Sequence, residues 1–293
     1  MELGAMVRLA HPANRLPNTS SAQPPLRFKL FQAGSAVSLR QRQQILPSKG
    51  RWTILAAGAV DSTMQPIVAP SRDVLELWRT AEAVCFDVDS TVCVDEGIDE
   101  LASYCGAGEA VASWTAKAMG GTVTFQQALA ARLGLFRPSL SVVNQYLTSH
   151  PPKLTPGIRE LVEKVHSRGT QVYLVSGGFR QMIEPAAVLL GIPKENIFAN
   201  RLVFDDAGGF DGFDEDEPTS RSGGKATAIA LIKKQHGYKR MVMIGDGATD
   251  LEARMPGGAD IFICFAGVQM RPNVAAGADW CVTDFNTLAQ GLD

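Results

Sequence analysis

The stretch AVCFDVDST (residues 83–91) joins a short apolar run to two aspartates, and similar apolar runs recur along the chain. They lie at residues 172–175, 241–244 and 261–265. A short, continuously apolar run is typical of a strand buried on both faces of a parallel sheet. Segments of helical composition lie between the runs, at residues 157–167, 179–190 and 226–234. This alternation predicts an α/β fold with a doubly wound, Rossmann-like parallel sheet.

Two further segments interrupt this alternation. Residues 97–152 contain Ala-rich periodic stretches and predict a small helical cap inserted after the first strand. Residues 197–214 instead predict a hairpin, because Leu202–Phe204 and Phe210–Phe213 flank a turn rich in Asp and Gly. We therefore divide the chain into a leader (1–60), the start of the core (61–96), the cap (97–152) and the rest of the α/β core (153–293).

The leader differs in charge from the rest of the chain. The whole sequence of 293 residues carries a net charge of −2, but residues 1–60 hold eight Lys and Arg and one Glu, which gives +7 and leaves −9 for the remainder. A basic, acid-poor segment rich in Ser and Thr is typical of an organellar transit peptide. Its composition alone does not separate a chloroplast from a mitochondrial destination, and an ordinary disordered tail remains the alternative.

Composition also argues against several classes of protein. The acidic remainder lacks the clustered basic side chains that nucleic-acid binding requires. No apolar run approaches the roughly 20 residues of a membrane span, so we expect no membrane partner. The five cysteines are scattered without a CxxC pair, and the four histidines show no metal-ligand spacing, so neither a disulfide framework nor a zinc site is expected.

Polar residues follow three of the predicted strands. They are Asp87 and Asp89 after the first, Ser176-Gly177-Gly178 after the second, and Asp246 and Asp250 after the third, with Lys225 opening an intervening helix. Ligands of open α/β sheets bind beyond the carboxyl ends of the strands. We therefore expect these side chains to meet in one crevice.

The chemistry of this group favours phosphoryl transfer. Crowded carboxylates require a compensating cation, and hard oxygen ligands favour Mg²⁺. The free amides of a Ser-Gly-Gly turn and the ammonium of Lys225 suit an anion such as phosphate. One aspartate of the Asp87/Asp89 pair can act as nucleophile while the other transfers protons.

These residues resemble the motifs of the haloacid dehalogenase phosphatases. DVDST (87–91) is similar to the DxDx[TV] signature of that superfamily, and Ser176, Lys225 and GDGATD (245–250) match its other three motifs in order. A lone DxD is weak evidence, but four motifs, each at a strand end or helix start, are a specific combination.

Within that superfamily the chain is similar to the phosphoserine phosphatase family of plant plastids from about residue 78 onward. The segments that carry the resemblance are DVDSTVCVDEGIDELA (87–102), MGGTVTF (119–125), SGGFRQMIEP (176–185), RSGGKA (221–226) and GDGATDLEA (245–253). The resemblance implies hydrolysis of O-phospho-L-serine through an aspartyl phosphate, as the last step of serine synthesis. It also implies Mg²⁺ as cofactor and O-phospho-L-serine as the small-molecule partner.

The resemblance further implies a role for individual residues. Asp87 would be the nucleophile and a metal ligand, and Asp89 the general acid/base whose carbonyl also binds the metal. Asp246 would be the third ligand, supported from behind by Asp250. The substrate would be held by residues with distinct tasks: Ser176, Gly177 and Lys225 at the phosphate, Glu96 at the ammonium, Arg132 at the carboxylate, Met119, Gly120 and Phe125 around the pocket, and Thr249 and Arg271 as assistants.

Two alternatives remain open from the sequence. The chain could act on another small phosphomonoester, or it could be a catalytically silent binding module of the same fold. The second is disfavoured because a silent relative has no chemical need for all four of the residues Asp87, Asp89, Lys225 and Asp246. A homodimer and a monomer are both compatible with the sequence.

Overall fold

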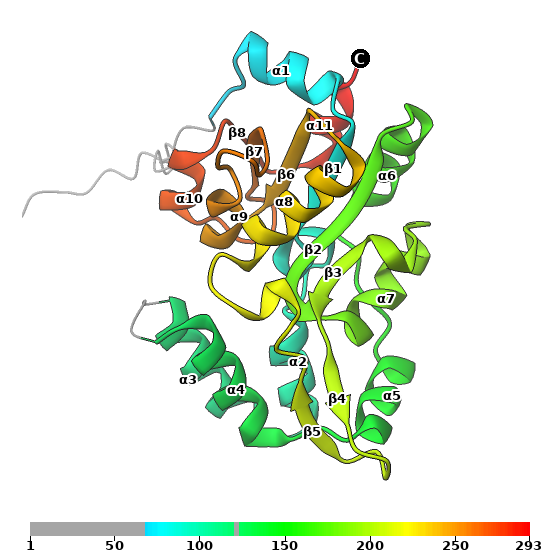
Figure 1. Cartoon of the computed structure of the whole chain (residues 1–293), viewed down its shortest axis with the longest axis vertical. Coiled ribbons are helices and arrows are strands. Elements are labelled where there is room, and N and C mark those ends of the chain that lie inside the picture. Colours follow the sequence, from blue (N-terminus) through cyan, green and yellow to red (C-terminus); the bar gives the residue numbers. More distant parts are fainter. Residues whose placement is uncertain (1–67, 120–122) are drawn as a thin grey trace, which may run out of the picture. The chain divides into compact units, whose positions relative to one another are not determined.

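The computed structural model describes residues 68–119 and 123–293, and these form a six-stranded parallel sheet flanked by helices (Figure 1). The strand order is β3-β2-β1-β6-β7-β8. The strands are β1 (Ala83–Phe86), β2 (Gln171–Phe179), β3 (Ile197–Asn200), β6 (Met241–Gly245), β7 (Ile261–Phe265) and β8 (Trp280–Val282). All four residues of β1 are buried, because helices cover both faces of the sheet.

Alternate residues of each strand belong to two separate hydrophobic cores. One core packs the sheet against α1 (Arg72–Arg79), α6 (Ile158–Ser167), α7 (Arg180–Leu189) and α11 (Phe285–Gly291). The other packs it against α8 (Gly224–His236), α9 (Ala248–Glu252) and α10 (Pro272–Gly277). The side chains of a strand point alternately to opposite faces. Val84 and Phe86 therefore enter the first core, and Ala83 and Cys85 the second, as expected for a doubly wound sheet.

The central position of β1 determines where the site forms. Phe86 is paired with Leu174 of β2 on one side and with Ile244 of β6 on the other. β1 and β6 therefore end at nearly the same level, where β2 continues through Ser176 to Phe179, and the polar residues at this level meet at one edge of the sheet. This is the edge at which parallel α/β sheets bind their ligands.

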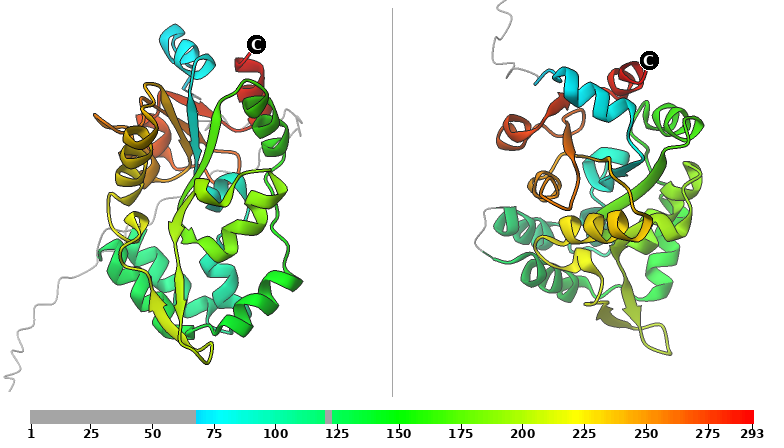
Figure 2. Two further views of the ribbon diagram at one scale, coloured as in Figure 1. Left: turned by 45° about the vertical axis from the view of Figure 1, so that its right-hand side comes forward. Right: turned by 45° about the horizontal axis from the view of Figure 1, so that its top comes forward.

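A second layer follows β1 in the chain and covers this edge (Figures 1 and 2). It contains α2 (Gly97–Tyr104), α3 (Gly108–Met119), α4 (Phe125–Phe136) and α5 (Leu140–Ser149), together with the antiparallel hairpin β4 (Leu202–Phe204) and β5 (Phe210–Phe213). Its own core joins Leu101, Leu129 and Val143 of the helices to Leu202 of the hairpin. We call α2 to α5 the cap helices.

Short turns link these elements. They are η1 (Val88–Val92), η2 (Lys194–Asn196) and η3 (Pro218–Ser220). Within η1, Ser90 has a left-handed backbone with φ of 54°, a conformation that costs energy for a residue with a side chain. None of the described helices is long and apolar enough to cross a bilayer.

The predicted fold class is confirmed, and so are the four apolar strands, the hairpin and helices near the predicted positions. Among the described elements, the strands β3 and β8 and the helices α9, α10 and α11 were not predicted, and α5 lies within the predicted helical cap. β3 and β8 are short edge strands, and β3 immediately precedes the hairpin, so its residues were assigned to that hairpin segment. The predicted leader lies outside the described residues.

Candidate active site

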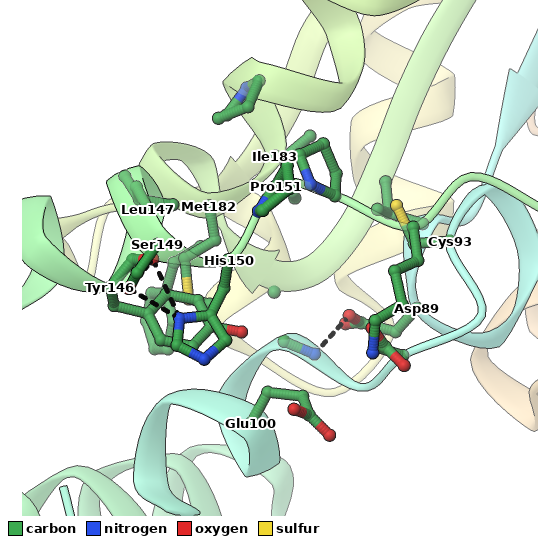
Figure 3. A pocket seen from close by; sticks show the side chains of 18 residues that line it. Asp89, Cys93, Glu100, Tyr146, Leu147, Ser149, His150, Pro151, Met182 and Ile183 are labelled. Atoms are coloured by element: carbon green, nitrogen blue, oxygen red, sulfur yellow. Dashed lines mark hydrogen bonds and ion pairs between the residues drawn. The ribbon is translucent and has the colours of Figure 1, made fainter. Parts of the chain in front are cut away.

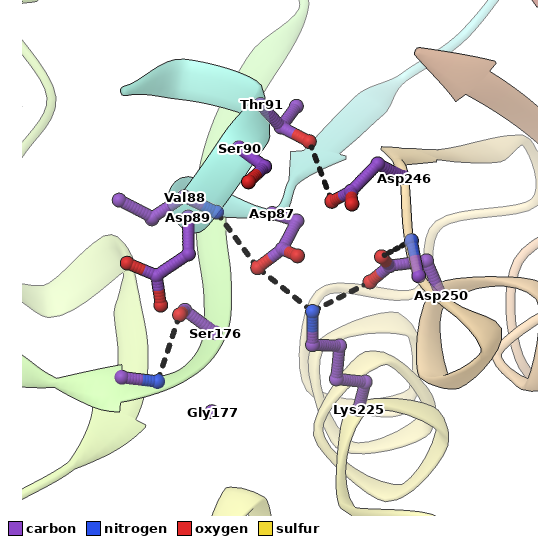
Figure 4. A network of polar contacts seen from close by, with 12 residues as sticks. Asp87, Val88, Asp89, Ser90, Thr91, Ser176, Gly177, Lys225, Asp246 and Asp250 are labelled. Atoms are coloured by element: carbon purple, nitrogen blue, oxygen red, sulfur yellow. Dashed lines mark hydrogen bonds and ion pairs between the residues drawn. The ribbon is translucent and has the colours of Figure 1, made fainter. Parts of the chain in front are cut away.

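Asp87 follows β1 directly and is fixed by backbone contacts. Its amide donates to the Ile244 carbonyl of β6 (2.9 Å), so the chain leaves β1 still tied to the neighbouring strand. The Val88 amide donates to Asp87 Oδ1 (2.7 Å). The carboxylate of Asp87 is buried and points across the carboxyl edge of the sheet toward α8 (Figure 4).

Lys225 joins Asp87 to Asp250. Its Nζ lies 2.7 Å from Asp87 Oδ1 and 2.6 Å from Asp250 Oδ1, and all three side chains are buried. Burial alone would lower the pKa of Lys225, but the attraction of Asp250 and Asp87 outweighs it and raises the pKa. The ammonium therefore keeps its charge within the protein. Burial and the charge of Asp87 raise the pKa of Asp250 above its ordinary value, against the opposing effect of Lys225.

Asp246 brings a third carboxylate to this group. Carboxylate oxygens of Asp87, Asp246 and Asp250 all lie within 4.8 Å of one another. Arg271 Nε donates to Asp246 Oδ2 (2.9 Å), and the hydroxyl of Thr91 lies 3.4 Å from Asp246 Oδ1. Burial and the charge of Asp87 nevertheless raise the pKa of Asp246. An all-oxygen, acidic and buried donor set of this kind fits a hard divalent cation such as Mg²⁺.

A turn within β2 forms the facing wall. The Gly178 amide donates to the buried Ser176 Oγ (2.9 Å), which fixes the hydroxyl at the strand end. Asn200, buried at the end of β3, donates from Nδ2 to the Gly177 carbonyl (2.8 Å) and accepts from the Thr219 hydroxyl (3.0 Å). The backbone of this turn is therefore held rigidly from both sides.

Phe125 brings the cap to this turn. A Cβ on Gly177 would lie only 2.9 Å from Phe125 Cζ, so the ring of the α4 residue packs directly on the glycine. Any side chain at position 177 would displace the ring. The close approach explains why glycine is needed here and places Phe125 beside the Ser-Gly-Gly turn.

Asp89 connects the loop that follows β1 to the first cap helix. Its Oδ1 accepts from the amide of Gly97 (2.8 Å), the first residue of α2. Burial, and then the charges of Glu96 and Asp87, raise the pKa of Asp89 from 3.8 to about 7. A carboxyl group with this pKa can give or take a proton near neutral pH, as general acid/base chemistry requires.

The two predicted recognition side chains lie at the cap side of this loop. Glu96 precedes α2 and accepts from the Ser90 hydroxyl on Oε1 (2.8 Å). Burial raises the pKa of Glu96, and the hydrogen bond from Ser90 opposes the effect. Arg132 is buried in α4, where Nε donates to the Ala128 carbonyl (3.3 Å). Burial lowers the pKa of Arg132, while the charges of Asp99, Asp89 and Glu96 oppose this change.

For three predicted site residues, the described part of the structure gives no contact with the rest of the site. Thr249 is exposed on α9, and the described contacts do not join it to the other predicted residues. Met119 is the last residue of α3, whereas Gly120 lies outside the described residues. The described hydrogen bonds of Arg132 are to Ala128 and Thr115 within the cap, and the remaining predicted residues contact the three carboxylates, the Ser-Gly-Gly turn or the loop that follows β1.

Asp89 also lines a cavity of about 230 Å³ (Figure 3). It is lined by the segments that lead into and out of the cap, including Cys93, His150 and Lys153, and by Met182 of α7. Of the predicted site residues, only Asp89 lines it. The cavity is therefore distinct from the group formed by Lys225 and the three aspartates.

Several contributing residues were not predicted from the sequence. Thr91 contacts Asp246, Asn200 holds the Gly177 carbonyl, and Ser90 holds Glu96. Asn200 could have been found, because it ends an apolar run in the same way as Asp87 and Ser176 end theirs. Ser90 and Thr91 lie within the DVDST motif, but their hydrogen-bond partners depend on the backbone of η1, where Ser90 is left-handed.

Comparisons with known proteins agree with this geometry. The family model of the haloacid dehalogenase-like hydrolases matches residues 81–254. A phosphoserine phosphatase of chloroplasts from Arabidopsis thaliana is 66% identical over 226 residues, which cover 77% of this chain and 77% of that protein. The phosphoserine phosphatase of Bos taurus is 52% identical, and the match covers 74% of this chain and 96% of that protein.

A solved structure described as a phospho-aspartyl intermediate analogue of phosphoserine phosphatase superposes with a TM-score of 0.62. It is 29% identical in sequence, and the superposition covers 73% of this chain and 99% of that one.

The raised pKa of Asp89 predicts a stability difference for Asp89→Asn in the presence of EDTA. A folded-state pKa of about 7, against the ordinary 3.8, means that the wild type loses stability as pH rises from about 4 to 7. The asparagine keeps the acceptor for Gly97 and carries no charge. We expect the variant to be more stable than the wild type by about 1–3 kcal/mol at pH 8, and much less so at pH 5.

Urea unfolding at both pH values measures this difference. Asp206→Asn, which changes an exposed carboxylate in the β4–β5 turn, is the matched control and should give the same difference at both pH values. A difference in stability between Asp89→Asn and the wild type that does not grow with pH would show that the half-buried charge of Asp89 does not destabilise the fold.

Proposed function

This chain belongs to the haloacid dehalogenase-like hydrolases and, within them, to the phosphoserine phosphatase family, and we propose that it hydrolyses O-phospho-L-serine to L-serine and phosphate. The observation that carries the proposal is the buried arrangement of Asp87, Lys225 and the Ser176-Gly177 turn. It combines a fixed carboxylate nucleophile, a permanent positive charge and backbone amides suited to an anion. These are the parts that phosphoryl transfer from a monoester needs.

Asp87 is the proposed nucleophile. Its contacts with Lys225 and with the Val88 amide both use Oδ1, so we assign the attack to Oδ2. Attack on phosphorus forms an aspartyl phosphate and breaks the bond between phosphorus and the serine oxygen. Lys225 and the amides of the Ser176-Gly177 turn would stabilise the charge on the phosphoryl oxygens.

Asp89 is the proposed proton carrier. In the first step its carboxyl group gives a proton to the departing serine oxygen. In the second step the resulting carboxylate takes a proton from a water molecule, which attacks the aspartyl phosphate. Phosphate and the free Asp87 carboxylate are released, and Asp89 is protonated again, so the cycle closes without net proton gain by the protein.

Mg²⁺ is the proposed cofactor, held by the carboxylates of Asp87 and Asp246 and by the carbonyl of Asp89. When bound, it would neutralise charge that develops on the phosphoryl group. Asp250 Oδ1 accepts from Lys225 (2.6 Å), and its Oδ2 accepts from the Gly247 amide (2.9 Å). We therefore place Asp250 behind the site as the residue that orients Lys225.

The cap side of the site is the proposed recognition surface for serine. Glu96 would accept from the ammonium, and Arg132 would donate to the carboxylate, for which a guanidinium has matching geometry. Phe125, with Met119 and Gly120, would enclose the substrate. Arg271 would assist through Asp246, and Thr249 from the start of α9. We also propose that residues 97–152 form one cap unit over the core.

A phosphate-release assay tests this function. The wild type with Mg²⁺ should release phosphate from O-phospho-L-serine, EDTA should remove the activity, and Asp87→Asn should lower it by more than about 10³-fold. Asp206→Asn serves as a control of unchanged activity. If the protein prefers a sugar phosphate to phosphoserine, the proposed substrate is wrong. If it releases phosphate from no phosphomonoester, the alternative of a silent binding module holds.

We further propose that residues 1–60 direct the protein to the chloroplast stroma, as the basic, acid-poor composition and the chloroplast relative support. In plant cells, a fluorescent protein fused behind these residues should coincide with chlorophyll fluorescence. The same fluorescent protein without them should remain in the cytosol. Coincidence with a mitochondrial dye would contradict the destination.

A further inference from the structure

Glu96 is held by a hydroxyl group from the catalytic loop. It occupies the position just before α2, yet its carboxylate does not cap that helix. Instead, Oε1 accepts from the Ser90 hydroxyl (2.8 Å), and Ser90 can reach it because its backbone is left-handed, with φ of 54°. A strained backbone that persists beside a functional group commonly serves the geometry of that group. The contact leaves Oε2 of Glu96 as the acceptor for a substrate ammonium.

Arg132 is held in a similar way by a hydroxyl group of the cap. Its Nη1 donates to Thr115 Oγ1 of α3 (3.4 Å). The hydrogen of that hydroxyl has two acceptors, Asp99 Oδ1 of α2 and the Val111 carbonyl, each at 3.3 Å. In either case a lone pair of the Thr115 oxygen is left for Arg132. The chain of contacts ties Arg132 to two other cap helices.

We infer that Ser90 and Thr115 are positioning residues that set which charged groups a substrate must carry, Ser90 through Glu96 and Thr115 through Arg132. The inference rests on the proposed function, because Glu96 and Arg132 recognise the ammonium and carboxylate only if phosphoserine is the substrate. Neither hydroxyl takes part in the chemistry at phosphorus.

The physical reason is loss of side-chain freedom. Glu and Arg have several rotatable bonds, and their ordering on binding weakens affinity unless it is completed beforehand. A hydroxyl that fixes one atom of each charged group leaves the other atoms aimed at the substrate. Its removal should therefore weaken recognition of one substrate group and leave the other unchanged.

Three substrates separate the two effects. O-phospho-L-serine carries both groups, O-phosphoethanolamine lacks the carboxylate, and 3-phosphoglycerate has a hydroxyl in place of the ammonium. Thr115→Val, which removes the hydroxyl and keeps the shape, should lower kcat/KM for phosphoserine about 3–10-fold, mainly through KM. Its kcat/KM for phosphoethanolamine should change less than about 2-fold, and Thr115→Ser should restore the wild-type values.

Ser90→Ala and Ser90→Gly provide the matched test of the other contact. The glycine suits the left-handed backbone and the alanine does not, so an effect common to both reflects the lost hydroxyl. In both, the ratio of kcat/KM for phosphoserine to that for 3-phosphoglycerate should fall about 3–10-fold. A change in proton transfer at the neighbouring Asp89 would affect both substrates alike, so it cancels in this ratio. Competitive inhibition constants replace kcat/KM wherever an analogue is bound without turnover.

The outcomes are distinguishable. The inference is supported if the wild type hydrolyses phosphoserine and each variant affects one comparison only. Thr115→Val should lower kcat/KM for phosphoserine relative to phosphoethanolamine, and the Ser90 variants should lower it relative to 3-phosphoglycerate. Wild-type turnover with all substrates affected equally, or no rescue by Thr115→Ser, would overturn the inference and leave the proposed function intact. No wild-type turnover of phosphoserine would overturn the proposed function and this inference with it.

Discussion

The ammonium of Lys225 lies between the buried carboxylates of Asp87 and Asp250, and the rest of the site depends on it. Without this charge, Asp87, Asp246 and Asp250 would repel one another at a place that water hardly reaches. The fold holds Lys225 there by close backbone packing. Gly224, just before it, has no room for a side chain, because a Cβ would lie 2.2 Å from the Pro218 carbonyl oxygen. The start of α8 therefore rests directly on η3 and directs Lys225 into the crevice.

The loop after β1 also joins the catalytic core to the cap. Asp89 accepts from Gly97 and Ser90 donates to Glu96, so two neighbouring loop residues both engage the start of α2. Phe125 packs on Gly177 from the other side of the site. The loop that carries the proposed proton donor Asp89 is therefore in contact with Glu96, the proposed partner of the serine ammonium. This coupling is consistent with a site in which recognition of the substrate and proton transfer depend on the same short loop.

Sequence reasoning identified the residues whose position follows from strand order. Asp87, Ser176 and Asp246 each come directly after a buried apolar run, and parallel strands bring such residues together. It did not identify Asn200, because β3 was merged with the hairpin. The partners of Ser90 and Thr115 were also beyond reach, since one depends on a left-handed turn and the other on how α2, α3 and α4 pack. Such contacts arise from tertiary packing, which local periodicity does not encode.

If Asp87 is the nucleophile, it carries the phosphoryl group during turnover. Borohydride reduces an acyl phosphate, so the wild type quenched with it during phosphoserine hydrolysis should contain homoserine at position 87. Peptide mass spectrometry measures this change. We expect homoserine at position 87 only when substrate and Mg²⁺ are both present. Reduction at another aspartate, or at no residue while phosphate is released, would show that Asp87 is not the nucleophile.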